Sequence, residues 1–354
     1  MSTFQVVVTR LSGVETHPNA DSLSLAVVGD YRTVIKKGQY QAGDLVAYIP
    51  ESAVLPLEVL RHLQMEGSSL LAGPDKNRVK AIKLRGELSQ GLCYPVEPDW
   101  AEGQDVTDLL GITKYEPPIP AHLMGQVQNI GVEHTFHFDI ENIKAWPDVL
   151  QEGEPVVFTE KIHGTWSCFG LQDGVQGLIV SSKGLFGQGL AFKDVPENAL
   201  NLYVRVSRRL GIENRLRQLF GSNVYLIGEV FGVQDLKYGA SAASDEKLGF
   251  RVFDIYLGKA GQGAYLGDED LDKACERLSI PRVPVLYRGP FSKEELCRHT
   301  SGRETVSGSA LHIREGVVVA PLVERSHPRL GRVKLKSVSS DYLLRKDKNA
   351  TEFE

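Results

Sequence analysis

Short apolar runs separated by turn signals are the feature that most constrains how the first hundred residues fold. The runs are rich in β-branched and aromatic residues, and steps such as Gly29-Asp30 and Gly43-Asp44 interrupt them. We predict strands at 4–11, 23–28, 31–36, 45–49, 79–84 and 91–96, and a short helix at 55–63. Closely spaced short strands of this kind indicate a small β-barrel.

A helix between the fourth and fifth strands is common in barrels of the OB type, which we therefore predict for this region. The 79–84 strand carries a basic edge made of Arg78, Lys80, Lys83 and Arg85. OB-type barrels hold single-stranded nucleic acid with basic side chains and stacking aromatics, so these residues are candidate nucleic-acid contacts. A solvated strand face is an equally good interpretation.

Composition limits the class of protein and its location. The chain has 354 residues, 42% of them hydrophobic, which is enough for two domains with separate cores. Its net charge of −5 requires that any nucleic-acid surface be a local basic patch. Its four cysteines form no CxxC pair, and no signal pattern or membrane-length apolar run is present. We expect buried thiols and a cytoplasmic, monomeric protein without membrane attachment.

A proline-rich stretch separates the barrel from the rest of the chain. Pro117, Pro118 and Pro120 exclude regular helix there. We predict a barrel domain at 1–118, a linker or arm at 119–150, and a second domain at 151–354. Within the arm, residues 138–146 are expected to lie on a pocket of the second domain.

The second domain is predicted to be α+β, with antiparallel sheets and flanking helices. Predicted strands are 154–159, 166–171, 177–182, 223–231, 248–257, 310–320 and 332–336. Predicted helices are 194–220, with a break at Gly211, 268–278 and 292–299. No GxGxxG or GxxxxGK[ST] motif links a strand to a helix, which disfavours Rossmann and P-loop folds.

Lys161 is the candidate nucleophile because it stands at the end of the apolar 154–159 run, just before a turn at Gly164. An amine attacks only when neutral, and at an ordinary pKa only about one lysine in a thousand is neutral at physiological pH. Burial or nearby cations must therefore lower the pKa of Lys161, and Lys334 and Lys336 are candidate cations. Because they stand two residues apart in a predicted strand, both would point to the same side of it.

The stretch Glu160-Lys161-Ile162-His163-Gly164-Thr165 resembles the first motif of ATP-dependent RNA ligases with an N-terminal OB domain. Further segments resemble the later motifs of that family in the same order: Ser182-Lys183-Gly184, Gly228-Glu229-Val230, Val252-Phe253-Asp254, Glu315-Gly316-Val317 and Lys334-Leu335-Lys336. One residue departs from the family pattern, because Trp166 stands where relatives usually have asparagine.

The resemblance implies roles for these residues. Lys161 would take AMP from ATP, with Lys334 and Lys336 assisting catalysis. Glu160, Ile162, Gly164, Lys183, Glu229, Phe253, Glu315 and the two downstream lysines would bind the nucleotide. Phe253 would stack on adenine, and Glu229 and Glu315 would hold Mg²⁺ or Mn²⁺.

The implied activity is sealing of nicked or broken RNA, with 3′-OH and 5′-phosphate ends and in some cases a bridging template strand, as in RNA repair. Two alternatives remain open. One is another lysyl-nucleotide enzyme, such as a DNA ligase or a capping guanylyltransferase. The other is a non-catalytic RNA-binding protein with the same fold.

Overall fold

The computed structural model describes residues 4–115 and 125–345 and divides the chain into two compact units. Of the described residues, unit 2 contains 4–115 together with 141–149 and 338–345. Unit 1 contains 125–140 and 150–337. One segment of the predicted arm and the last described segment of the predicted second domain thus belong with the N-terminal unit. The boundaries 1–118, 119–150 and 151–354 stay a prediction.

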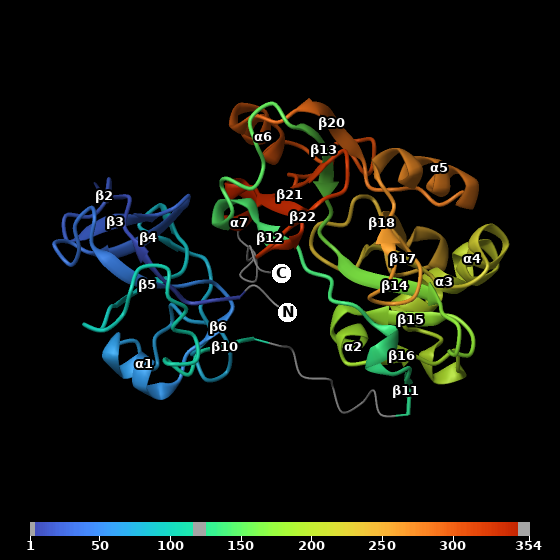
Figure 1. Cartoon of the computed structure of the whole chain (residues 1–354), viewed down its shortest axis with the longest axis horizontal. Helices are drawn as coiled ribbons and strands as arrows, with labels where there is room; N and C mark the ends of the chain where they lie inside the picture. Colours follow the sequence, from blue (N-terminus) through green and yellow to red (C-terminus); the bar gives the residue numbers. More distant parts are fainter. Residues whose placement is uncertain (1–3, 116–124, 346–354) are drawn as a thin grey trace. The chain divides into compact units, whose positions relative to one another are not determined.

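Unit 2 consists mainly of short antiparallel strands (Figure 1). Its strands are β1 (Val7–Arg10), β2 (Gly13–Thr16), β3 (Leu23–Val28), β4 (Tyr31–Lys36), β5 (Leu45–Ile49), β6 (Ala53–Val54), β7 (Ile82–Leu84), β8 (Glu87–Ser89), β9 (Leu92–Pro95), β10 (Thr113–Lys114) and β12 (Glu141–Asn142). Its α-helices are α1 (Leu57–His62) and α7 (Ser340–Leu343). A 3₁₀ turn, η3, spans Ile143–Ala145.

Strand β5 is apolar along its whole length because both of its faces are covered. It pairs with β1 on one side and β9 on the other. Val46 and Tyr48 enter one core, which also contains residues of β3 and β4, while Ala47 and Ile49 enter a second core beneath α1. Residues 31–36 and 45–49 form the strands predicted from sequence, but β2 and β8 were not predicted.

Unit 1 is built on two antiparallel sheets (Figure 1). Its strands are β11 (Val127–Asn129), β13 (Pro155–Lys161), β14 (Thr165–Leu171), β15 (Ile179–Ser182), β16 (Leu190–Phe192), β17 (Val224–Phe231), β18 (Gly249–Leu257), β19 (Ala264–Tyr265), β20 (Val285–Pro290), β21 (Gly316–Pro321), β22 (Ser326–His327), β23 (Gly331–Arg332) and β24 (Leu335–Val338), whose last residue falls in unit 2. One sheet has the order β15-β14-β17-β18-β19, and the other contains β24-β21-β13-β20.

Helices cover one face of the first sheet. They are α3 (Leu202–Leu210), α4 (Ile212–Phe220) and α5 (Asp268–Leu278), and they enclose a core with Phe169, Leu226 and Val252 (Figure 1). The remaining helices are α2 (Lys183–Gly187), α6 (Lys293–Thr300) and the 3₁₀ turns η2 (Val132–His134), η4 (Pro196–Asn198) and η5 (Asp245–Lys247).

The break predicted at Gly211 is confirmed, since this residue adopts a left-handed conformation (φ 56°) between α3 and α4. The predicted helix start at 194 is wrong. The side chain of Asn201 accepts the backbone N–H groups of Tyr203 and Val204, which caps α3 seven residues later.

Two further expectations can be compared with the structure. Cys93, Cys168 and Cys275 are buried free thiols, but Cys297 is exposed, so the expectation of four buried thiols is wrong for Cys297. Within residues 4–115 and 125–345, no helix has the length and apolar character needed to cross a membrane.

Candidate active site

Lys161 is the last residue of β13, and its side chain is bound by the carboxylate of Glu315, the residue just before β21. β13 pairs with β21 so that Lys161 lies opposite Gly316, directly after Glu315. The Lys161 ammonium donates to Glu315 Oε1 at 2.5 Å, and the two side chains are only 14% and 3% exposed. Since a nearly buried ion pair is costly to break, this contact fixes where both side chains lie.

Gly164 lets the turn after Lys161 approach the neighbouring sheet closely. A Cβ atom at this position would lie 2.5 Å from the Val230 carbonyl oxygen and 2.7 Å from Glu229 Cγ. The Gly164 N–H also favours the charged form of Glu229 and so opposes the rise of its pKa. Gly164 is therefore required for this approach, rather than for a positive φ, and it brings the predicted nucleophile near Glu229 on β17.

Glu229 lies in an electrostatic environment that disfavours its charged form. Burial raises its pKa to about 8, with Glu315 adding to the rise and Lys161 and Lys183 opposing it. At neutral pH without ligands the carboxyl group is therefore mostly protonated. Glu229, Glu315, Lys161 and Lys183, which were predicted from separate segments, thus lie close enough together to influence one another.

His163 was part of the first motif but was not among the predicted site residues. Its Nε2 lies 2.7 Å from Asp235 Oδ1, its Nδ1 lies 3.8 Å from Glu315 Oε2, and its backbone N–H donates to the Tyr238 hydroxyl at 2.7 Å. Its position between Lys161 and Gly164 in the first motif could have identified it as a site residue. Nothing in the sequence pointed to Asp235 or Tyr238.

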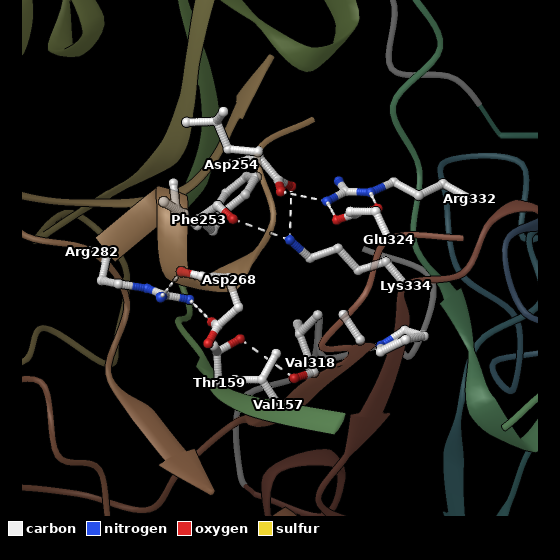
Figure 2. Close-up of a pocket in the computed structure, with 14 residues that line it drawn as sticks. Val157, Thr159, Phe253, Asp254, Asp268, Arg282, Val318, Glu324, Arg332 and Lys334 are labelled. Carbon is white, nitrogen blue, oxygen red and sulfur yellow. Dashed lines mark hydrogen bonds and ion pairs between the residues drawn. The ribbon is translucent and has the colours of Figure 1, made fainter. Parts of the chain in front are cut away.

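A pocket lies between β13 and β21 on one side and β18 on the other (Figure 2). Val157 and Thr159 line it. Lys161 lies on the same face of β13, because every second side chain of a strand points to the same side. Phe253 and Val318 also line the pocket. Phe253 therefore has the exposure to a pocket that a base-stacking residue requires.

Lys334 reaches into this pocket but is bound by protein groups (Figure 2). Its ammonium donates to Asp254 Oδ2 at 2.8 Å and to the Phe253 carbonyl oxygen at 3.1 Å. Burial lowers the pKa of Lys334, although Asp254 opposes this. Burial also disfavours the Asp254 anion, but the ion pairs with Arg332 and Lys334 outweigh it, and the Asp254 pKa lies below its ordinary value.

Arg332 extends this network and was not predicted. It donates to Asp254 Oδ1 at 2.8 Å and to Glu324, and its guanidinium lies 3.7 Å from the centre of the Tyr265 ring. These contacts join residues as far as 78 positions apart, and sequence reasoning has no local signal for them.

The remaining predicted residues occupy several places. Ile162, on the Lys161 turn, and Lys336, on β24, are both buried. Glu160 is also buried, and its Oε2 accepts hydrogen bonds from the Thr305 N–H and hydroxyl at 2.8 and 2.6 Å. Burial raises the pKa of Glu160, and its Oε1 has no hydrogen-bond partner among the described residues.

The predicted nucleic-acid residues belong to unit 2, whereas Lys161 and the pocket belong to unit 1. Lys83 is exposed on β7, and Arg85 is exposed in the turn to β8 with φ 46°. Asn19 supports this turn by donating to the Arg85 carbonyl at 2.9 Å. Arg78 instead lies 4.1 Å from the centre of the Tyr115 ring, and Lys80 is half-buried.

The carboxylates beside Lys161 suit a divalent cation. Glu315 Oε2 is buried and has no hydrogen-bond partner among the described residues, and Glu229 is a nearby carboxyl that burial keeps neutral. No group of three or more His, Cys, Asp or Glu side chains in the described residues is arranged to hold a metal. This donor set fits Mg²⁺ or Mn²⁺ held by one or two carboxylates, with water and phosphate oxygens completing the shell.

The fold and this site together define a nucleotidyltransferase-like domain preceded by a small barrel, and comparison with known families agrees. A model for the RNA ligase family matches residues 154–338, and a model for an OB-fold domain matches residues 5–96. The chain belongs to the RNA ligase family. The predicted α+β class and the OB-type barrel are confirmed.

Solved structures of one RNA ligase, from Naegleria gruberi, share the fold. A mutant with ATP and Mn is 22% identical, with a TM-score of 0.74 over 95% of this chain and 97% of that one. A mutant with AMP and Mn is 22% identical, with a TM-score of 0.77 over 97% and 98%. The ligase with PPi is 23% identical, with a TM-score of 0.75 over the same shares. No curated protein matches the chain.

The raised pKa of Glu229 predicts a pH-dependent stability difference. Folding shifts this pKa from 4.5 to about 8, so between these values the wild type loses stability as pH rises, because unfolding releases a proton. Glu229→Gln, which stays neutral, should therefore be more stable by about 1 kcal/mol or more at pH 8. The difference in Tm between Glu229→Gln and the wild type should grow up to about pH 8 and then level off. It is measured in EDTA so that no metal binds the carboxyl group. A Tm difference independent of pH would contradict the pKa.

The close approach at Gly164 predicts that an added methyl group displaces the Lys161 turn. Gly164→Ala should slow modification of Lys161 by nucleotide about a hundredfold or more, the usual effect of shifting a reacting group by about 1 Å. Gly187→Ala is the matched control, since a Cβ there meets no atom within 4 Å. Mass spectrometry of the intact protein after incubation with ATP and metal would give both rates. Equal rates for the two variants would contradict this role for Gly164.

Proposed function

We propose that the protein is an ATP-dependent RNA ligase that joins 3′-OH and 5′-phosphate RNA ends through lysyl-AMP and RNA-adenylate intermediates, and that it acts in RNA repair. The observation that carries the proposal is Lys161, which is nearly buried against Glu315 at the end of β13, beside a pocket lined by Phe253 and Lys334. Membership in the RNA ligase family supports the reaction class. The ATP, AMP and PPi in the structures of the Naegleria enzyme support ATP as the co-substrate.

In the first step, the Lys161 amine attacks the α-phosphorus of ATP, so an N–P bond forms and pyrophosphate leaves. The contact with Glu315 favours the ammonium form in the resting protein, and this contact must weaken before the amine can attack. A divalent cation held by Glu229 and Glu315 would neutralise carboxylate and phosphate charge.

The next two steps transfer AMP to the RNA and then release it. An oxygen of the RNA 5′-phosphate attacks the lysyl-AMP phosphorus, and the Lys161 nitrogen leaves. The RNA 3′-OH then attacks the 5′-phosphorus, a phosphodiester forms, and AMP leaves. Phosphoryl transfer of this kind depends mainly on positioning and charge neutralisation, which Lys183, Lys334 and Lys336 would supply.

The base would lie between Phe253 and Val318, which line the pocket from β18 and β21. Glu160 Oε1 has no partner among the described residues, but Glu160 alternates with Thr159 and Lys161 along β13 and does not line this pocket. Its predicted contact with the nucleotide is therefore not part of this proposal. Ile162 and Gly164 would shape the turn beneath the nucleotide. A nick held by a template strand, a cytoplasmic location and a monomeric state remain predictions.

The basic turn of the barrel is the proposed RNA contact. Lys83 and Arg85 are exposed, and their side chains form no ion pair within the part of the chain that the structure describes. By contrast, Arg10 and Arg61 of the same unit are paired with Glu102 and Glu66 at 2.7 and 3.4 Å. Unpaired cations exchange counterions for phosphates more readily, so we assign RNA affinity to the Lys83 and Arg85 side chains rather than to Arg78.

The nucleophile is tested with α-labelled ATP, Mg²⁺ or Mn²⁺, and variants of Lys161. Wild-type protein should form an acid-labile adduct with ATP and much less with GTP, which separates ligation from capping. Lys161→Arg keeps a cation beside Glu315 but cannot become neutral, so it should lose the adduct completely and keep a Tm near that of the wild type. Lys161→Ala should also lose it, with a lower Tm because Glu315 is left unpaired. An adduct on Lys161→Arg would disprove the assignment.

The RNA surface is tested by removing the two unpaired cations. Lys83→Gln with Arg85→Gln should weaken binding of nicked RNA and make the log–log salt slope less steep by between about 1 and 2. Adduct formation with ATP should not change, because these residues belong to unit 2 and the nucleotide pocket to unit 1. The control, Arg10→Gln with Arg61→Gln, removes two cations that are already paired and should change the slope much less. Equal slopes for the two double variants would rule out this surface.

A further inference from the structure

The arm that precedes the second domain is fastened to unit 1 before it reaches the nucleotide site. β11 pairs with β16, and the Ile130 N–H donates to the Gly189 carbonyl at 2.8 Å. The Tyr225 hydroxyl donates to the His134 carbonyl at 2.9 Å. Phe136 then enters an aromatic cluster with Phe186, Tyr225, Tyr256 and Tyr265, at centroid distances of 4.5 to 6.2 Å. The arm therefore has a fixed path across the sheet face.

The next two contacts of the arm are with residues assigned above to the nucleotide. The Phe138 ring lies 5.5 Å from the Phe253 ring and 5.7 Å from the Trp166 ring, measured between centroids. The adjacent Asp139 carboxylate accepts a hydrogen bond from Lys183 Nζ at 3.0 Å. Consecutive arm residues thus contact the proposed base-stacking residue and one of the proposed phosphate cations.

Phe138 supports Phe253 and does not take the place of the base. Phe253 lines the pocket together with Val318, but Phe138 is not among the described residues that line it. The ring of Phe253 therefore has the pocket on one side and the arm on another. Aromatic pairs at this distance prefer defined tilted or offset geometries, so Phe138 restricts the orientation of the Phe253 ring.

Trp166 completes this arrangement. Its ring lies between Phe138 and Phe186, 5.7 Å from each centroid, and its Nε1 is buried with no hydrogen-bond partner among the described residues. An unsatisfied buried N–H is costly, so packing of the indole ring must compensate for it. The indole at a position where relatives usually have asparagine is thus explained by its packing against the arm.

We propose that Phe138 is a positioning residue for ATP: it holds the Phe253 ring in the orientation that accepts the base, while Asp139 keeps Lys183 beside the site. The arm then contributes to nucleotide affinity without touching the nucleotide. This inference rests on the proposed function, because it requires that Phe253 receive the base of ATP.

The test compares Phe138→Leu with Phe136→Leu in the full-length protein, using single-turnover adduct formation at increasing ATP concentration. Phe138→Leu keeps an apolar side chain but removes the ring that orients Phe253. It should raise the half-saturating ATP concentration about threefold to tenfold and change the maximal rate less than about twofold. Phe138→Tyr, which keeps the ring, should have the half-saturating ATP concentration of the wild type.

Phe136→Leu is the matched control because it removes a ring from the same arm that contacts the aromatic cluster but not Phe253. It should lower the Tm at least as much as Phe138→Leu and leave the half-saturating ATP concentration unchanged. Equal shifts in both variants would reduce the arm to a structural role and overturn the proposal. A lower half-saturating concentration in Phe138→Leu would also overturn it, since the arm would then obstruct ATP.

The two hypotheses fail in different ways. If wild-type protein forms no adduct with ATP, the proposed function fails, whatever the variants do. If wild-type protein forms the adduct and Phe138→Leu has a wild-type ATP dependence, only the role of Phe138 fails.

Discussion

The ion pair between Lys161 and Glu315 is the interaction on which the geometry of the site depends. It joins the last residue of β13 to the residue before β21, and the pairing of these strands places the two side chains together. A carboxylate that is 3% exposed has little water to stabilise it, so the lysine must remain beside it in the resting protein. The two members of the pair have opposite effects on the pKa of Glu229. Glu315 raises this pKa, while Lys161 lowers it.

The same arrangement recurs at the other cations of the site. Lys334 is paired with Asp254 at 2.8 Å, and Lys183 with Asp139 at 3.0 Å. An overall acidic chain thus pairs Lys161, Lys183 and Lys334, the lysines proposed to contact the nucleotide, with its own carboxylates. Phosphate oxygens must replace these carboxylates or share the cations with them, so the net gain on binding is smaller than the number of lysines suggests. Such pairing also disfavours binding of anions that cannot engage several of these lysines at once.

Local signals explain what the sequence could predict. Residues 268–278 form α5 as predicted, because acidic residues in the first turn and a periodic apolar face both favour helix there. Lys161, Glu229, Phe253 and Glu315 were each predicted from a short segment around them. Asp235, Asp254 and Arg332 were not named as site residues, because each acts through a partner that is distant in sequence. The Lys161–Glu315 contact itself spans 154 positions, and only the strand pairing reveals it.

The division of the chain argues against treating the barrel as a module that can be removed without effect. Residues 141–149, from the predicted arm, and 338–345, from the predicted second domain, group with the barrel by their contacts. Lys144 donates to Gln90 at 3.2 Å and lies 5.7 Å from the centre of the Tyr31 ring, so this segment is bound by the barrel's own residues. Ile143, Tyr342 and Leu343 are buried in the whole protein. Deleting residues 1–118 would remove the unit with which these segments group, and the resulting loss of stability would obscure any effect on RNA binding. The contribution of the barrel is therefore better measured by changing exposed side chains in the intact chain than by truncation.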